Sequence, residues 1–319
     1  DYKTGVLVGS VFIIGYTFVG GYKAVSYTDV VQGVLMLLGL IAVPAAAIIA
    51  SGGWGEVKLS LAEQDPALLD MFAFSGKPAL IGIASFVAVG LPFLGVPQLL
   101  VRYMSARDDG EIRKARIMSM IVVLIFTAGA VTAGVAGRAL YPGLEDHETI
   151  FPVISNNLFP PVIAGMLLVV VLSAIMSTVD SLLLLASSSI VRDTYQKIMG
   201  SDEDDARLSN YGKAITVVIG VIAVLLGMRE PKVIFDFVLA SWSGLGSAFG
   251  PVIIGILYYR RITWLGVLTG MLGGFAASVA WLTWFKAEYY GLYEAIPGFI
   301  AGLALTFGVS YLTSGKKTS

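Results

Sequence analysis

The chain has 319 residues, of which 56% are hydrophobic and only 13% are charged, and its mean hydropathy is +0.82. This is too little charge to cover the surface of a soluble domain, so the composition predicts an integral membrane protein. The net charge of −1 does not favour binding to nucleic acid, and the lack of cysteine in the sequence excludes disulfides, thiol catalysis and cysteine metal sites.

Apolar segments of roughly 20 residues recur along the chain and predict an all-α bundle of transmembrane helices. A β-barrel would instead show short segments of alternating polarity. The connections are too short for a soluble domain, so we expect residues 1–319 to form a single transmembrane domain. Charged residues, glycine and proline delimit nine predicted spans, near 5–21, 28–50, 79–104, 115–139, 161–185, 212–229, 233–258, 263–285 and 294–313.

Basic residues are unevenly divided between the two sides of this predicted bundle. With residue 1 outside, 14 of the 21 Lys and Arg residues fall on the inner side. The positive-inside rule therefore predicts an outer N-terminus and a cytoplasmic C-terminal "GKKTS" in a cell membrane. Because the chain opens with "DYKTG" and has neither an initiator methionine nor a signal peptide, we expect it to be part of a longer protein.

No feature of the sequence indicates an enzyme. The one histidine of the sequence, His147, falls in an acidic connection with no nucleophile near it. The stretch "GLGSAFG" lacks the spacing of a dinucleotide-binding loop. Glycines at every fourth residue instead predict close packing between helices. They are Gly246 and Gly250 in one segment and Gly266, Gly270 and Gly274 in another.

The fifth predicted span contains an unusually polar stretch, "SAIMSTVDSLLLLASSS" at 173–189. At about 100° per residue, its small and hydroxyl-bearing residues gather on one side of a helix. Ala174, Ser177, Thr178 and Ser181 share one face, and Asp180 lies on a neighbouring stripe. Hydroxyls alone are also typical of residues that join helices by hydrogen bonds, and that alternative stays open.

Asp180 favours a bound ion over hydroxyl groups that only join helices. A carboxylate at membrane depth costs about 3 kcal/mol or more unless something compensates it. The next basic residue on this helix, Arg192, is about 18 Å further along. Hydroxyl and carbonyl oxygens with at most one carboxylate suit a hard monovalent cation, so the stretch predicts a cation site.

Two further stretches are unusual for membrane spans, one for an acidic side chain and the other for its helix-breaking residues. Asp29, in "GGYKAVSYTDVVQG", begins the second span and is either a helix N-cap or a second acidic ligand. In the third span, "FVAVGLPFLGVPQLLVRYMSA", two glycines and two prolines fall between Gly90 and Pro97. They predict an interrupted helix, as transporters use to expose backbone groups to solutes, although a simple proline kink is the alternative.

Four segments also resemble a known family. "GGYKAVSYTDVVQGVLM", "GVPQLLVRYMSA", "AIMSTVDSLLLLASSSIVRDTY" and "YGLYEAIPGFIAG" are similar to the sodium/solute symporter family, most closely its sodium/proline symporter branch. The resemblance implies a LeuT-type core of two inverted five-helix repeats. On this mapping the chain begins at the fourth core helix. Residues 1–51 end the first repeat, about 79–260 form the second, and 263–313 add two peripheral helices.

The resemblance also implies ligands for sodium as the coupling ion. Ala174, Ser177 and Thr178 match the family's sodium ligands on the eighth core helix. A possible second sodium site matches Asp29, Asp180 and Ser181, although Asp180 is more often a hydroxyl residue in the family.

The interrupted third span matches the helix that contacts substrate in the family. Val89, Phe93, Pro97 and Gln98 are therefore the expected solute-binding residues. Proline transporters resemble one another in a tryptophan and a tyrosine where this chain has Val89 and Phe93, which leaves proline as the favourite among small organic solutes.

The resemblance implies sodium-coupled symport of proline, or a similar amino or carboxylic acid, by alternating access. The expected partners are the solute and the lipid bilayer, with no nucleic acid and no obligate protein partner. Two alternatives stay open. One is a proton-coupled carrier in which Asp180 or Asp29 titrates, and the other is a transporter-like membrane sensor belonging to a signalling protein.

Overall fold

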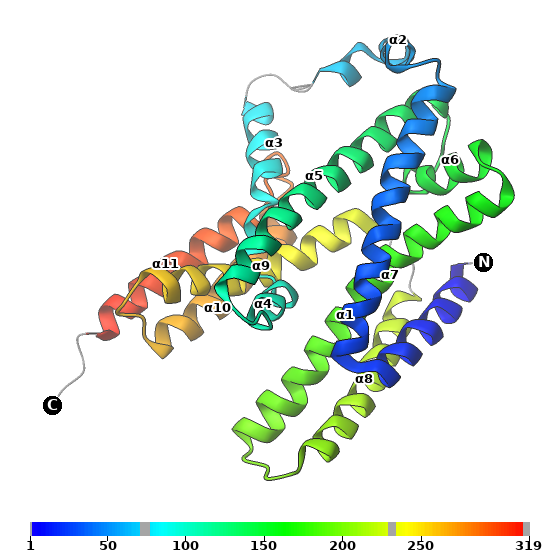
Figure 1. The fold of residues 1–319 in the computed structure, drawn as a ribbon. Coiled ribbons are helices and arrows are strands. Elements are labelled where there is room, and N and C mark those ends of the chain that lie inside the picture. The colour runs from blue at the N-terminus through cyan, green and yellow to red at the C-terminus, as the bar shows by residue number, and fades with distance from the viewer. Residues whose placement is uncertain (1, 71–76, 229–233, 315–319) are drawn as a thin grey trace. The chain divides into compact units, whose positions relative to one another are not determined.

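The computed structural model describes residues 2–70, 77–228 and 234–314, and every regular element in these ranges is helical (Figure 1). Within them, seven helices are long and apolar enough to cross a membrane, and a bent pair brings the number to eight. The all-α membrane fold is thus confirmed, whereas the predicted count of nine spans is not. The difference arises in the first helix, which contains two of the predicted spans in one element.

The described residues form two compact units. The first lies within Asp1–Met71 and Arg107–Glu230, and the second within Phe72–Ala106 and Pro231–Ser319. The elements of the first unit are α1 (Tyr2–Ala50), α2 (Trp54–Gln64), η1 (Pro66–Leu69), α5 (Asp109–Leu140), η3 (His147–Thr149), α6 (Ile150–Leu158), α7 (Pro161–Ser188), the π-helix η4 (Ser189–Ile198) and α8 (Asp205–Gly227).

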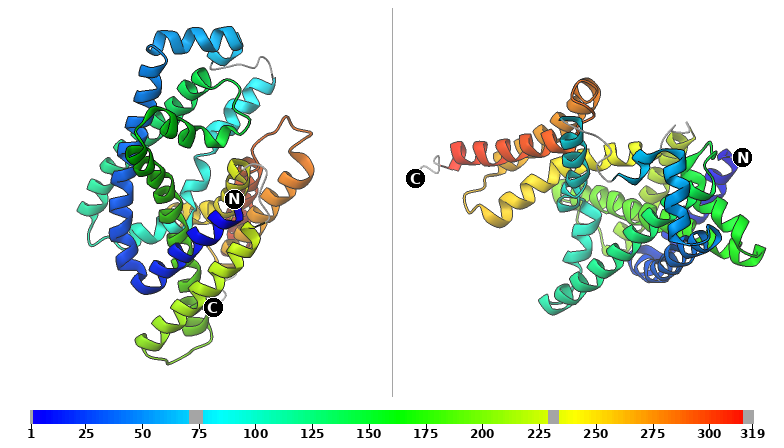
Figure 2. Two further views of the ribbon diagram at one scale, coloured as in Figure 1. Left: turned by 90° about the vertical axis from the view of Figure 1, so that its right-hand side faces the viewer. Right: turned by 90° about the horizontal axis from the view of Figure 1, so that it is seen from above.

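Helix α1 is the centre of the first unit. It turns at Gly21, where φ is 58° and ψ is −167°, a left-handed conformation that glycine adopts without steric cost. The turn divides α1 into a first arm and a longer second arm, which correspond to the predicted spans 5–21 and 28–50 (Figure 1). Helices α5, α7 and α8 all pack against α1, as the two views of Figure 2 allow the reader to follow.

Glycines bring these helices close together. A Cβ on Gly39 of α1 would meet Val170 of α7, and a Cβ on Gly220 of α8 would meet Ile14. At one end of the unit, α2 and α6 cover an apolar cluster that α1, α5 and α7 also build. The buried members of this cluster are Val43, Ala47, Val57, Leu61, Ala136, Ile154 and Leu167.

The second unit contains the interrupted span and the last three long helices. Its elements are α3 (Lys77–Ala88), η2 (Leu91–Leu94), α4 (Pro97–Met104), α9 (Ile234–Tyr258), α10 (Trp264–Ala280), the π-helix η5 (Trp281–Phe285) and α11 (Ala295–Ser314). Helices α9, α10 and α11 pack against one another. The close packing predicted from the glycine spacing is confirmed here, because a Cβ on Gly270 would collide with Thr306 and one on Gly274 with the Ser247 carbonyl.

An ion pair between a buried carboxylate and a partly exposed lysine holds the connection between α10 and α11. The Glu294 side chain is fully buried and lies 2.9 Å from the Lys286 ammonium. It also accepts a hydrogen bond of 3.2 Å from Ser243 on α9, whose hydroxyl accepts one of 3.2 Å from Ser278 on α10. The pair and its hydrogen bonds satisfy a carboxylate that would otherwise be expensive to bury.

We predict that Gly129→Ala destabilises the first unit. A Cβ at this position of α5 would collide with the carbonyl oxygen of Leu40 on α1. Backbone cannot move aside as a side chain can, so we expect a loss of about 1–3 kcal/mol and a lower thermal unfolding midpoint in detergent. Gly134→Ala on the same helix is the control, since nothing lies within 4 Å of its added Cβ. Equal midpoints for the two variants would contradict this packing.

Candidate functional site

One turn of α7 brings together the three residues predicted to bind sodium. The Ser177 hydroxyl donates to the Ala174 carbonyl oxygen at 3.2 Å, and the Thr178 hydroxyl donates to the same oxygen at 3.1 Å. Ala174 and Thr178 are exposed. Three uncharged oxygens therefore converge on an accessible face of the helix, and these are oxygen ligands of the kind that a hard monovalent cation accepts.

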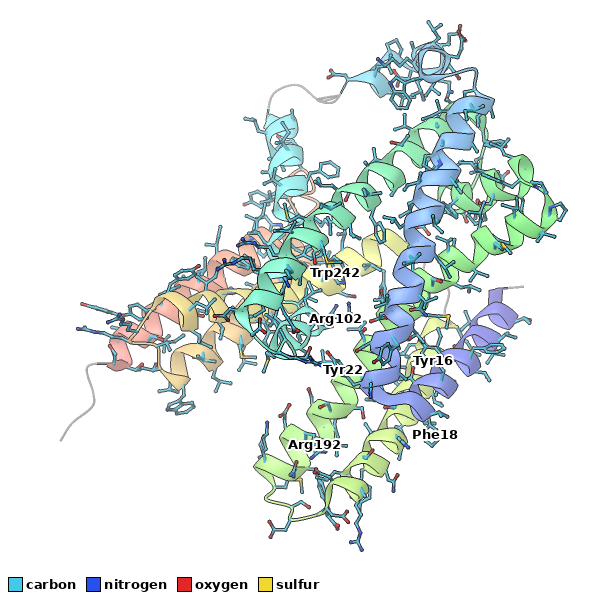
Figure 3. The ribbon with its side chains drawn as sticks, viewed as in Figure 1. Tyr16, Phe18, Tyr22, Arg102, Arg192 and Trp242 are labelled. Atoms are coloured by element: carbon cyan, nitrogen blue, oxygen red, sulfur yellow. The ribbon has the colours of Figure 1, made fainter. Side chains whose placement is uncertain are left out.

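Asp180 is completely buried beside this face. Its Oδ2 accepts a hydrogen bond of 2.5 Å from the Tyr16 hydroxyl, which comes from the first arm of α1 (Figure 3). On its own helix, Ser181 lies 3.4 Å from the other carboxyl oxygen and donates to the Ser177 carbonyl at 2.8 Å. The carboxylate is thus connected both to a neighbouring helix and to the turn that carries the candidate sodium ligands.

Sequence reasoning missed Tyr16 and Gln32 of α1. Tyr16 stands in an apolar run with no motif to mark it, and the Gln32 side chain, which is 7% exposed, lies beside the Tyr16 hydroxyl. The one available signal is their polarity within an apolar span, because a polar side chain at membrane depth needs a partner. That signal does not tell which helix supplies the partner.

Asp29 lies on the second arm of α1, beyond the Gly21 turn. The N-cap alternative is wrong, because α1 is already helical before and after this position. The residue is half-buried, its Oδ1 is shielded from solvent, and its helix packs against α7. A cation shared by Asp29, Asp180 and Ser181 stays a prediction.

The predicted interruption of the third span is confirmed in the second unit. Helix α3 ends at Ala88, the short 3-10 turn η2 follows, and α4 begins at Pro97 with its axis bent by 45°. Pro92 lies inside η2, and Pro97 occupies the first position of α4, where a missing amide hydrogen costs nothing. The chain between Gly90 and Pro97 is therefore a broken span, as the glycines and prolines predict.

Helix α9 lies directly against this break. A Cβ on Gly246 would collide with Pro92, and one on Gly95 would collide with the backbone of Gly250. One turn before Gly246, the Trp242 ring meets the Phe93 ring edge to face, with centroids 4.8 Å apart and planes at 84° (Figure 3). Neither glycine contact leaves room for a side chain. The backbone of the break is therefore in direct contact with the backbone of α9.

The four residues predicted to bind solute differ in what they offer. Val89 packs beside the buried cluster of Ala88, Tyr293 and Ala295, whereas 46% of Phe93 is exposed. Gln98, one residue after Pro97, has a buried Oε1 without a hydrogen-bond partner in the described part of the chain. The break therefore presents the aromatic surface of Phe93 and the amide oxygen of Gln98, which accepts no hydrogen bond from the described residues.

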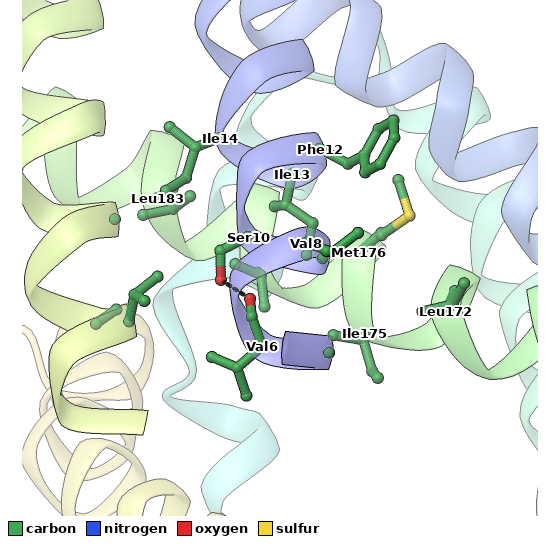
Figure 4. Close-up of a pocket in the computed structure, with 16 residues that line it drawn as sticks. Val6, Val8, Ser10, Phe12, Ile13, Ile14, Leu172, Ile175, Met176 and Leu183 are labelled. Atoms are coloured by element: carbon green, nitrogen blue, oxygen red, sulfur yellow. Dashed lines mark hydrogen bonds between the residues drawn. The ribbon is translucent and has the colours of Figure 1, made fainter. Parts of the chain in front are cut away.

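A groove of about 960 Å³ runs between the first arm of α1, α7 and α8 of the first unit (Figure 4). Its lining is aliphatic and aromatic except for Ser10, whose hydroxyl donates to the Val6 carbonyl of its own helix at 2.5 Å. The groove thus offers no polar group to orient an ion or a polar solute, and we do not place either there.

We predict that Tyr16→Phe lowers the thermal stability of the protein in sodium-free detergent. The change leaves the buried Asp180 carboxylate short of a hydrogen bond, at a cost of about 1–3 kcal/mol. Tyr27→Phe, on the same helix at a site that is 68% exposed, is the control. Adding Asp180→Asn to Tyr16→Phe should recover part of the loss. A Tyr16→Phe midpoint equal to that of the control would show that the contact does not matter for stability.

Sequence comparison identifies the family of the chain. The family described as "Sodium:solute symporter family" matches residues 1–274. The sodium/proline symporter of Staphylococcus aureus is 36% identical over 98% of this chain and 63% of its own length. The high-affinity proline transporter PutP of Bacillus subtilis (strain 168) is 37% identical over 98% of this chain and 66% of its own length. The chain therefore spans just under two thirds of these relatives, which are named as transporters and not as enzymes.

A solved structure shares the fold. A Na+-coupled sialic acid symporter, in a structure described as a substrate-bound outward-open state with a novel Na+ site, superposes with a TM-score of 0.74 at 19% identity. The match covers 98% of this chain and 67% of that one. This likeness confirms the LeuT-type fold class, and together with the sequence match it shows that the chain belongs to the sodium:solute symporter family.

Proposed function

We propose that the chain forms part of a sodium-coupled symporter that carries a small organic solute, with proline or a similar amino or carboxylic acid as the substrate class. The observation that carries this proposal is the convergence of the Ala174, Ser177 and Thr178 oxygens on one turn of α7. Membership of the sodium:solute symporter family and relatives named for sodium/proline symport support it. Transport then proceeds by alternating access.

Sodium is a transported substrate in this proposal, and α7 supplies its ligands. When sodium binds, the Ser177 and Thr178 hydroxyls turn their protons away from the Ala174 carbonyl, so that all three oxygens face the ion. No charged group is needed, and the ion can leave again because the site does not hold it with a full carboxylate. A second sodium site at Asp29, Asp180 and Ser181 would share the carboxylate that Tyr16 already contacts.

The same buried carboxylate supports a second candidate function, coupling to protons. Asp180 has no exposed surface, and a carboxyl group in such a place can be kept neutral by taking up a proton. In a proton-coupled carrier, Asp180 or Asp29 would titrate during transport in place of binding sodium. The two candidates differ in the ion gradient that drives uptake.

The solute is proposed to bind at the break of the third span. Phe93 offers a flat apolar surface to a small ring, with Val89 four residues before it and Pro97 four residues after it, and Gln98 offers an amide. The first turn of α4, which begins at Pro97, is the positive end of the helix dipole and attracts a carboxylate. An amino or carboxylic acid combines the groups that this arrangement favours.

The topology completes the proposal. The protein is a multi-pass membrane protein, and we place residue 1 outside and the C-terminal residues in the cytoplasm, following the distribution of Lys and Arg. Residues 1–51 are assigned to the end of the first inverted repeat, about 79–260 to the second, and 263–313 to two peripheral helices of one transporter domain. The solute and the bilayer are the proposed partners.

The test is uptake of radiolabelled solutes into proteoliposomes that contain the complete protein. We expect L-proline, or a related acid in the panel, to accumulate under an inward sodium gradient and not under a proton gradient alone. Accumulation under the proton gradient without sodium would support the second candidate. Sodium-independent equilibration, or no uptake of any solute, would overturn the symport proposal.

The same assay tests the ligands. Ser177→Ala and Thr178→Ala each remove one oxygen from the ion, so we expect the sodium concentration for half-maximal uptake to rise about tenfold or more, equivalent to about 1.4 kcal/mol. Ser188→Ala, which removes an exposed hydroxyl further along α7, is the control. Unchanged sodium dependence in both test variants would leave the hydroxyls only a helix-packing role.

A further inference from the structure

Helix α9 presents a single row of residues to the broken span. Trp242, Gly246 and Gly250 are four residues apart, so they lie above one another on the same face of a helix. Each meets one part of the break, since Trp242 contacts Phe93, Gly246 faces Pro92 and Gly250 faces Gly95. The tryptophan is therefore the side chain that this face of α9 directs toward the proposed solute residue Phe93.

The two glycine contacts fix where Trp242 stands. Because neither Gly246 nor Gly95 has space for a Cβ, the break and α9 lie in close backbone contact at both glycines. These backbone contacts lie one to two turns along α9 from Trp242 and hold the segment that carries Phe93 against this helix. The two aromatic rings stand nearly perpendicular, so Phe93 and Trp242 form a corner between the break and α9.

Trp242 also has a polar group to offer. Its indole N–H donates no hydrogen bond to any residue that the structure describes, and the ring is only partly buried. By contrast, the indole N–H of Trp281 in the same unit donates to the Leu292 carbonyl at 3.0 Å. An indole that combines an apolar face with an uncommitted donor is suited to bind a solute that has both an apolar ring and an acceptor.

We propose that Trp242 is a further solute-contacting residue, which together with Phe93 sets the size of the ring that the site accepts. This inference rests on the proposed function and adds a specificity determinant from α9 to the residues of the third span. The indole ring closes one side of the site against bulkier solutes, and its N–H donates to an oxygen of the solute.

The experiment measures binding of L-proline and of its six-membered-ring homologue L-pipecolate to the complete protein in detergent at saturating sodium. One methylene in an apolar pocket changes affinity by roughly 10–200-fold. Trp242→Ala opens the corner, so we expect the ratio of L-pipecolate to L-proline affinity to rise about tenfold or more. Sodium affinity without solute should stay as in wild type, which separates the effect from damage to the fold.

Two variants complete the design. Trp242→Phe keeps an aromatic ring but lacks the N–H, so both solutes should bind about fivefold or more weakly with a nearly unchanged ratio. Trp264→Ala, at a site on α10 that is 72% exposed, should behave as wild type. If Trp242→Ala does not fold, unchanged affinities in Trp242→Phe overturn the inference. An unchanged ratio in folded Trp242→Ala overturns it while leaving the proposed function intact. Wild-type protein that binds neither solute overturns the inference, whereas the proposed function fails only if no solute of the uptake panel is transported.

Discussion

The hydrocarbon region of a membrane contains no water to satisfy a polar group, and this constraint accounts for the main features of both units. An unsatisfied backbone or side-chain group there costs several kcal/mol, so each one needs a partner within the protein or a ligand. Asp180 meets the requirement through Tyr16. Next to the last span, the buried carboxylate of Glu294 is likewise paired with Lys286 and Ser243. The backbone freed between Gly90 and Pro97 rests against the glycines of α9.

Within each unit, close packing keeps the polar groups at defined places. In the first unit, Gly39 and Gly129 let α7 and α5 approach α1, and the candidate sodium oxygens lie on the α7 side of that assembly. In the second unit, Gly246 and Gly95 hold the broken span on α9. Glycine thus contributes here mainly by the absence of a side chain, which allows two backbones to meet where van der Waals contact must replace a hydrophobic driving force.

Local sequence signals predicted where helices break and which of their faces are polar, but not which residues of other helices those faces contact. Two prolines and two glycines within eight residues were enough to predict the break, because each proline removes a backbone donor. Helical periodicity likewise placed Ser177 and Thr178 on one face. Periodicity shows which face of a helix is polar but not what lies opposite, so Tyr16 beside Asp180 and Trp242 beside Phe93 required the structure. The continuation of α1 through the Gly21 turn escaped prediction because the glycines and Lys23 at this point are the signals that usually separate two spans.

In a sodium-coupled symporter, sodium and solute bind to one protein and stabilise each other, and calorimetry of the complete protein measures this coupling. The solute dissociation constant would be measured with and without saturating sodium, and the sodium dissociation constant with and without saturating solute. Thermodynamic linkage requires the two affinities to change by the same factor, and we expect that factor to be about tenfold or more. Solute binding that is unaffected by sodium would rule out sodium-coupled symport.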